Sequence, residues 1–197
     1  MKYLKMLGLA ALAAMAVMAF ISAGTASATE VYSGATTLKS GTELKSSLSG
    51  SATLTTTEGT VLDTCAGGEV NGKSSNNGSA TETVKYIIIL IHWTECIEPT
   101  LTIKVGTLEI HWTSGLNGTV TAGTASEVTV NTTIFGSCVF TIPTGGTIGT
   151  LTGSTSGNAT FDVNATATRV SGLCPSTTKW VGTYKVTSPS PLHVTAS

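Results

Sequence analysis

The chain has 197 residues, of which 11% are charged, 6% are aromatic and 41% are hydrophobic. Charged residues make up about a quarter of an average globular chain, and threonine and serine fill the deficit here. Ten basic and eleven acidic residues nearly cancel, and Arg169 is the single arginine. The chain therefore lacks the basic field that attracts nucleic acid. Low net charge combined with positive mean hydropathy also excludes a disordered chain.

The first 28 residues have the pattern of a secretory signal peptide. Two lysines near the N-terminus precede an apolar stretch from Met6 to Ile21, and a small-residue motif (ASA) ends at Ala28. We therefore expect an N-terminal signal helix that is cleaved between Ala28 and Thr29. The product, residues 29–197, would be a secreted, extracellular protein with no membrane span.

All four cysteines lie in this exported part: Cys65, Cys96, Cys138 and Cys174. Cysteines in an oxidising compartment usually form disulfides. Four cysteines allow three pairings, and we favour Cys65–Cys96 with Cys138–Cys174 because sequential elements of a sheet-rich chain are usually neighbours. The close cysteine pairs of a zinc site are missing, so we expect no metal.

Period-two alternation runs through the exported part, with Thr, Val and Ile at strand positions and Gly, Asn, Ser or Pro at the breaks. The clearest strand is Asn158 to Val170, where small apolar and polar residues alternate. Residues 86–93 (YIIILIHW) are apolar on both faces, which predicts a central strand covered from both sides. Further strands are expected near residues 42–48, 52–57, 60–65, 101–105, 108–112, 118–121, 128–134, 138–142, 148–152 and 179–188.

This pattern predicts an all-β fold. About ten short strands separated by turn signals favour one two-sheet antiparallel β-sandwich, Ig-like or jelly-roll-like, formed by residues 29–197 as a single domain. Residues 66–83 (AGGEVNGKSSNNGSATET) are rich in glycine and small polar residues. We expect them to form an exposed loop.

Residues that could carry catalysis are scarce. His92 and His111, with Glu95 and Glu109 nearby, form the one constellation that resembles a metal or acid–base site. No nucleophile elbow, HExxH motif, phosphate loop or dinucleotide fingerprint is present. We therefore expect no catalytic site, no cofactor and no metal. The alternative is a secreted hydrolase with its site near these two histidines.

The expected function is that of a non-enzymatic extracellular or cell-envelope-associated structural or interaction protein of unknown ligand. Its partner would be a cell-wall or envelope polysaccharide or a protein, bound through a strand face or through loops at one end of the sandwich. A second alternative is a soluble inhibitor of another secreted protein, presenting residues 66–83. Few charges guard the sheet edges, so self-association through them is also open.

Several segments resemble a known group of proteins. They are Leu4–Leu9, the ASA motif, Gly118–Val120, Glu127–Val130, Ile148–Gly153, Cys174–Ser176, Lys179–Trp180 and Tyr184–Pro189. Together they are similar to small secreted Thr/Gly-rich β proteins that occur in many copies in soil actinobacteria, particularly Solirubrobacter-like lineages. That group has no assigned activity. The resemblance therefore implies a bacterial, exported, disulfide-bearing β protein and transfers no functional residue.

Overall fold

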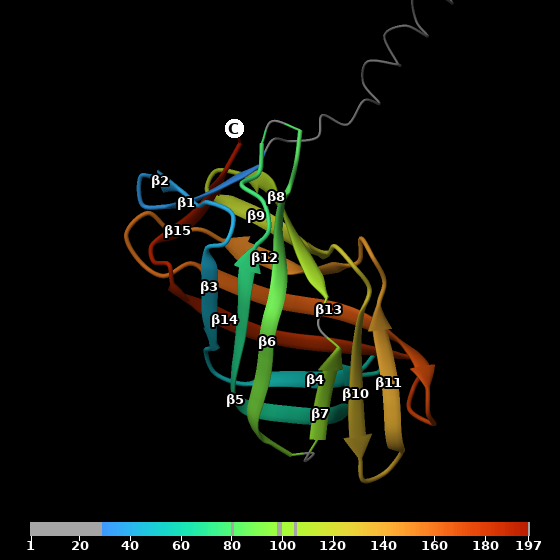
Figure 1. The fold of residues 1–197 in the computed structure, drawn as a ribbon. Coiled ribbons are helices and arrows are strands. Elements are labelled where there is room, and N and C mark those ends of the chain that lie inside the picture. The colour runs from blue at the N-terminus through green and yellow to red at the C-terminus, as the bar shows by residue number, and fades with distance from the viewer. Residues whose placement is uncertain (1–28, 80, 98–99, 105, 197) are drawn as a thin grey trace, which may run out of the picture.

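The structure is a computed structural model that describes residues 29–79, 81–97, 100–104 and 106–196. These residues form antiparallel strands and turns and contain no helix (Figure 1). The protein is thus all β, as the alternating sequence pattern predicts. The expected signal helix and Ala28 lie outside the described residues.

The strands of the described part carry the labels of Figure 1. They are β1 (Glu30–Ser33), β2 (Thr36–Thr37), β3 (Glu43–Leu48), β4 (Ala52–Thr56), β5 (Val61–Ser74), β6 (Val84–Cys96), β7 (Thr100–Lys104), β8 (Thr107–Ser114), β9 (Asn117–Ala122), β10 (Ser126–Thr132), β11 (Gly136–Ile142), β12 (Thr147–Thr152), β13 (Thr160–Ser171), β14 (Thr177–Ser188) and β15 (Leu192–Thr195).

Most of these strands belong to one antiparallel sheet that closes on itself. Following the hydrogen bonds from β14 leads through β4, β5, β6, β8, β9, β12 and β13 and back to β14. A separate three-stranded sheet, in the order β15-β1-β2, lies beside the ends of β8 and β9 (Figure 1). Because closure pairs the outer strands of a sheet with each other, it removes the edges that would otherwise be free.

The ring of paired strands has two halves along its length. Four long strands, β5, β6, β13 and β14, run through both halves. In one half β3, β8, β9 and β12 complete the circle. In the other half β4 pairs with β5 and β14, and β11, β10 and β7 extend from β13. Among the described residues no hydrogen bonds join β7 to β6, so this second half has a seam between them.

Two clusters of buried apolar side chains fill the interior. The larger cluster includes Tyr86, Ile110, Val120, Phe161 and Tyr184, and the smaller one includes Leu54, Val130, Phe140, Cys138 and Cys174. Ile142 and Trp180 pack against both clusters and so join them. Each fully buried side chain of this size contributes about 1.5–3 kcal/mol by leaving water.

Two disulfides link strands in the pairing that the sequence favours. Cys65–Cys96 ties β5 to the end of β6, and Cys138–Cys174 ties β11 to the turn before β14. Cys138 and Cys174 are fully buried, whereas Cys96 is half-buried. Both bonds are consistent with folding in an oxidising, extracellular environment.

The prediction of an exposed loop over residues 66–83 is wrong for its first half, because β5 continues to Ser74. The glycines that suggested a loop allow close strand contacts instead. A Cβ atom on Gly68 would lie 2.6 Å from Cδ1 of Trp93, and one on Gly67 would lie 2.2 Å from Oγ1 of Thr94. At both positions a side chain would meet the neighbouring strand, so the glycines reflect close strand packing and not a turn.

The prediction that residues 86–93 are covered on both faces is also wrong. Val84, Tyr86 and Ile88 point into the core, while Ile87 and Ile89 are 49% and 55% exposed. At a bulge in β6, the inward–outward alternation of side chains and the pairing register with β5 shift together. There the partners of Ile88 and Leu90 are the consecutive residues Gly72 and Asn71. Ile89 is the extra residue, and beyond it the inward positions change parity.

Candidate functional site

The structure does not bring the two histidines of the candidate hydrolase site together. His92 is exposed on β6, opposite Glu69 of β5. His111 lies on β8 next to Ile110, whose partner on β6 is Val84. At about 3.3 Å per residue along β6, His92 is roughly 25 Å from that pairing point. A single site that uses both side chains therefore has no geometric support, and a hydrolase site near His92 or near His111 alone stays a prediction.

His111 and Glu109 take part in a surface network on β8. Nε2 of His111 lies 3.0 Å from Oγ1 of Thr121 and 3.8 Å from the Glu109 carboxylate. Glu109 also lies 3.4 Å from Nζ of Lys85, which is 52% exposed. Ion pairs in this setting contribute little to stability. Glu95, the other acid of the predicted constellation, lies at the far end of β6.

One group of potential metal ligands occurs among the described residues: Asp63, Cys65 and Cys96. The two cysteines are bonded to each other, so their sulfurs cannot act as thiolate ligands. Asp63 is fully buried, and its Oδ1 accepts a 2.7 Å hydrogen bond from the Thr64 N–H. The oxidised protein therefore offers no thiolate site here. That Asp63 faces inward was not predicted from the sequence.

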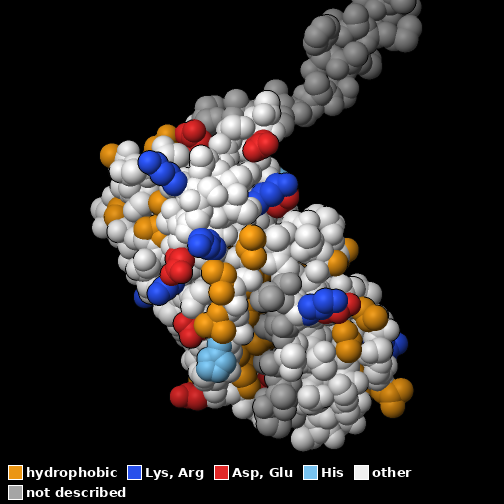
Figure 2. All heavy atoms as spheres, viewed as in Figure 1, with side chains coloured by type: hydrophobic (Ala, Val, Ile, Leu, Met, Phe, Trp, Pro, Cys, Tyr) orange, Lys and Arg blue, Asp and Glu red, His pale blue; other side chains and the backbone are white. Residues whose placement is uncertain are grey.

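The outer surface of β6 carries an exposed apolar stripe, which we call the β6 face and define as Ile87, Ile89 and Leu90. Leu90 is 41% exposed. Figure 2 shows hydrophobic side chains gathered in the middle of this face, with charged side chains along one side of them. Asn71 and Lys73 of β5 pair with Leu90 and Ile87 and form a polar margin on one side. Contiguous exposed apolar groups of this kind mark interaction sites more often than isolated ones do.

Among the described residues, the backbone of the same strand has an open edge, meaning one side without hydrogen-bond partners. Val84–Ile87 pair with β8, and the N–H of Ile88 donates to the Gly106 carbonyl at 3.2 Å. From Ile89 to Cys96, the described residues provide hydrogen-bond partners on the β5 side only. The unpaired N–H and C=O groups of such an edge can pair with another strand.

Behind the seam lies an apolar cavity of about 110 Å³. Ile91 and Trp93 of β6 line one side, Ser126 and Val128 of β10 another, and Trp180 of β14 a third. The rings of Trp93 and Trp180 lie 4.3 Å apart and are tilted by 41°. Trp93 thus forms part of the wall of this cavity.

Tyr184 connects the two sides of the cavity. Nε1 of Trp93 donates a 2.8 Å hydrogen bond to the Tyr184 hydroxyl oxygen. Burial raises the pKa of Tyr184, and the hydrogen bonds from Trp93 and Trp180 oppose that rise. The phenol is therefore neutral at physiological pH, and its own O–H remains as a donor.

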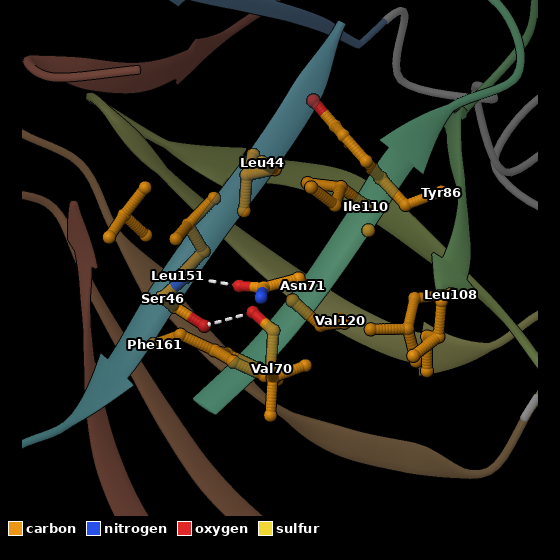
Figure 3. Close-up of a pocket in the computed structure, with 13 residues that line it drawn as sticks. Leu44, Ser46, Val70, Asn71, Tyr86, Leu108, Ile110, Val120, Leu151 and Phe161 are labelled. Atoms are coloured by element: carbon orange, nitrogen blue, oxygen red, sulfur yellow. Dashed lines mark hydrogen bonds between the residues drawn. The ribbon is translucent and has the colours of Figure 1, made fainter. Parts of the chain in front are cut away.

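A second cavity of about 50 Å³ lies further along the interior, between β3, β5 and β8 (Figure 3). Beside it the Ser46 hydroxyl donates to the Val70 carbonyl at 2.6 Å, and the Ser46 N–H donates to Oδ1 of Asn71 at 3.4 Å. Tyr86 also lines this space, and its buried hydroxyl has no hydrogen-bond partner among the described residues. Burial raises the pKa of the Tyr86 phenol above its ordinary value.

Sequence reasoning missed Tyr86, Ser126 and Tyr184 as interior polar groups. Tyr86 and Tyr184 each sit at an inward position of a predicted strand, which was the available signal. Ser126 gave no signal, because its burial depends on the neighbouring Gly106, whose Cβ position would lie 2.6 Å from the Ser126 Oγ. Only the tertiary arrangement brings these groups together.

Comparison of the chain with protein-family models, with curated proteins and with solved structures finds no match. In the part of the chain that the structure describes, no helix is long and apolar enough to cross a membrane.

Proposed function

We propose that this protein is a secreted, non-enzymatic interaction protein of the extracellular space or cell envelope, and that it contacts its partner through the β6 face and the open edge of β6. The observation that carries the proposal is the exposure of Ile87, Ile89 and Leu90 on a strand whose outer backbone edge, from Ile89 on, has no hydrogen-bond partner among the described residues. Two disulfides support export, because such bonds persist in oxidising compartments.

A protein partner fits this surface better than a polysaccharide does. The β6 face consists of aliphatic side chains, which offer neither hydrogen bonds nor aromatic stacking to a sugar. Trp93, further along β6, lines the interior cavity and is not part of this face. An unpaired edge, in contrast, can accept an extended segment of another protein as an added strand. A second copy of this chain is one such partner, through the pairing of two edges.

The finer architecture is part of the same proposal. We infer that the closed sheet is flattened into two facing layers, as in the predicted sandwich. The contact between Trp93 on β6 and Trp180 on β14, with ring centroids 4.3 Å apart across the interior, supports this inference. Membership of the actinobacterial group of small secreted β proteins is likewise proposed, on the resembling segments alone.

The test is a pull-down with the purified, oxidised protein. It would be mixed with host cell walls, isolated envelope polysaccharides and culture-supernatant proteins, and the bound fraction would be measured at rising salt. Saturable retention on a protein fraction that survives high salt is expected, because apolar contacts are not screened. Retention only on polysaccharide would contradict the choice of partner, and turnover that requires His92 or His111 would favour the hydrolase alternative.

The matched variants are Ile87→Thr with Ile89→Thr against Ile134→Thr. Threonine keeps the β-branched shape that suits a strand and removes apolar surface. Ile134 is 82% exposed and lies in the turn between β10 and β11, so the control makes the same change elsewhere. Retention should fall at least tenfold for the β6 variant and stay unchanged for the control.

A further inference from the structure

The two interior cavities are parts of one apolar space. They share four lining residues, Val70, Ile88, Leu108 and Phe161. The larger has a volume of about 110 Å³ and the smaller about 50 Å³. Native interiors are packed as densely as organic crystals and contain few voids larger than a water molecule. Unfilled space of this size is unusual in a small protein, and we therefore ask which molecule it would bind.

The chemistry of the walls restricts what that occupant can be. The larger cavity is lined by aliphatic and aromatic side chains, including Ile91, Phe161 and Trp180. Glu127 is the one charged side chain among its described lining residues, and its carboxylate lies 3.6 Å from Nζ of the exposed Lys104. Because the described lining residues include no cation, a bound anion would be uncompensated by them. The occupant is therefore neutral and mainly apolar.

Two hydroxyl groups, those of Ser126 and Tyr184, can form hydrogen bonds inside this otherwise apolar space, and we call them its polar point. The Ser126 Oγ is buried at the cavity and has no hydrogen-bond partner among the described residues. The Tyr184 oxygen accepts the Trp93 N–H, which leaves the phenolic hydrogen free to donate. A buried hydroxyl without a partner is unfavourable in the empty protein. A ligand that carries one hydrogen-bonding group would remove this cost, whereas a pure hydrocarbon would not.

The seam provides a route into the cavity. Ile91 and Trp93 line the cavity from the stretch of β6 that has no described partner on its outer edge. On the other side of the cavity stand Ser126 and Val128 of β10, the strand that pairs with β7. Between described residues of β6 and β7, no hydrogen bond closes this side of the cavity.

The geometry points to a binding site for a small, neutral, predominantly apolar molecule that carries one hydrogen-bonding group, held between Trp93, Trp180 and Ser126. Apolar cavities of about 150 Å³ in proteins bind benzene, and the two adjoining cavities, of about 110 and about 50 Å³, together reach this size, so the ligand is about the size of a single aromatic ring. This site is separate from the β6 face, and either can exist without the other.

The experiment uses three probes of nearly equal shape: toluene, 4-methylphenol and 4-methylbenzoate. Binding to the purified, oxidised protein is followed by calorimetry and by the fluorescence of the tryptophans, two of which line the cavity. Saturable binding of toluene and 4-methylphenol is expected, with no binding of the anionic 4-methylbenzoate. Failure of both neutral probes to bind, or equal binding of the anion, would overturn the proposal.

Cavity-filling variants test whether the probes bind in the cavity. Ala165→Leu fills space at a buried lining position and should weaken both neutral probes at least tenfold. Ala66→Leu makes the same change at an exposed position of β5 and should leave binding unchanged. If Ala165→Leu does not fold, Ala167→Leu on the same strand serves the same purpose. Unchanged binding in a folded cavity-filling variant would locate the probes elsewhere and overturn the assignment.

The polar point is tested by Ser126→Ala. The affinity of 4-methylphenol divided by that of toluene should fall about fivefold in this variant, the effect of one lost hydrogen bond. An unchanged ratio would show that Ser126 does not recognise the ligand's polar group and would contradict that part of the assignment.

Discussion

The indole N–H of Trp93 donates a 2.8 Å hydrogen bond to the Tyr184 hydroxyl, across the interior from β6 to β14. Residues 91 positions apart in the sequence are thereby fixed to each other at the cavity wall. Trp93 is held from two further sides, by the ring of Trp180 at 4.3 Å and by Gly68, where a Cβ would lie only 2.6 Å from its Cδ1. Trp93 is therefore the side chain on which the shape of the cavity depends most.

This arrangement predicts opposite effects for one substitution at two tyrosines. Tyr184→Phe leaves the Trp93 N–H without its acceptor and should destabilise the fold by about 1–3 kcal/mol. Tyr86→Phe removes a buried oxygen that has no hydrogen-bond partner among the described residues, and it should be neutral or stabilising by up to about 1 kcal/mol. Urea denaturation of both variants checks the pair, and a greater loss from Tyr86→Phe than from Tyr184→Phe would contradict it.

The same two tyrosines predict sensitivity to alkaline pH. Burial raises the pKa of both phenols, so the unfolded chain loses these protons at lower pH than the folded one does. Their contribution to stability is complete below about pH 10, the ordinary tyrosine pKa, and is lost as the pH rises above it.

Absorbance at 295 nm during an alkaline titration measures this effect directly. Tyr86 and Tyr184 should ionise only together with unfolding, seen as a coincident loss of the far-ultraviolet circular dichroism signal. Ionisation of both buried phenols near pH 10 with the fold intact would show that they are not shielded from water.

Gly68→Ala tests the close contact between β5 and β6. The new methyl group would push Trp93 from its place, and overpacking of this kind costs about 1–3 kcal/mol. The matched control is Gly157→Ala, where the nearest atom to a new Cβ is the Ser154 Oγ at 3.6 Å. Thermal unfolding should separate the two variants, with Gly157→Ala close to the parent protein. Equal stability of all three proteins would mean that Gly68 is not needed for packing.

The two disulfides should differ in their resistance to reduction. Cys96 is half-buried, whereas Cys138 and Cys174 are fully buried. Reductant should therefore open Cys65–Cys96 first, which alkylation followed by mass spectrometry would detect. Replacing both Cys138 and Cys174 by alanine releases a loop with a sequence separation of 36 residues and should cost about 4 kcal/mol. Simultaneous reduction of both bonds in the native state would contradict this order.

The alternation of apolar and polar residues predicted most of the strands, and it did so best where the chain is regular. On β13, Phe161, Val163 and Ala165 are buried as expected, with exposed polar residues between them. The pattern failed at Gly67 and Gly68, because glycine signals both turns and close strand contacts. Only the position of Trp93 on the neighbouring strand decides between these two roles.

The short strands β1, β2 and β15 were not predicted at all. Val31, Leu192 and Val194 are buried in the large core cluster, but each strand is too brief for its alternation to stand out from the background. Similarly, the β6 face could not be predicted, because the bulge at Ile89 changes which residues point outward. The cavity depends on distances between several strands, which no local pattern contains.

The most direct test of the central claim is to measure retention of the oxidised protein and of its Ile87→Thr/Ile89→Thr variant on proteins from the host's culture supernatant and envelope. The account predicts saturable retention of the parent protein, insensitivity to salt, and at least a tenfold loss in the variant. Retention that is equal for both proteins, or the absence of retention on any protein fraction, would contradict the role assigned to the β6 face.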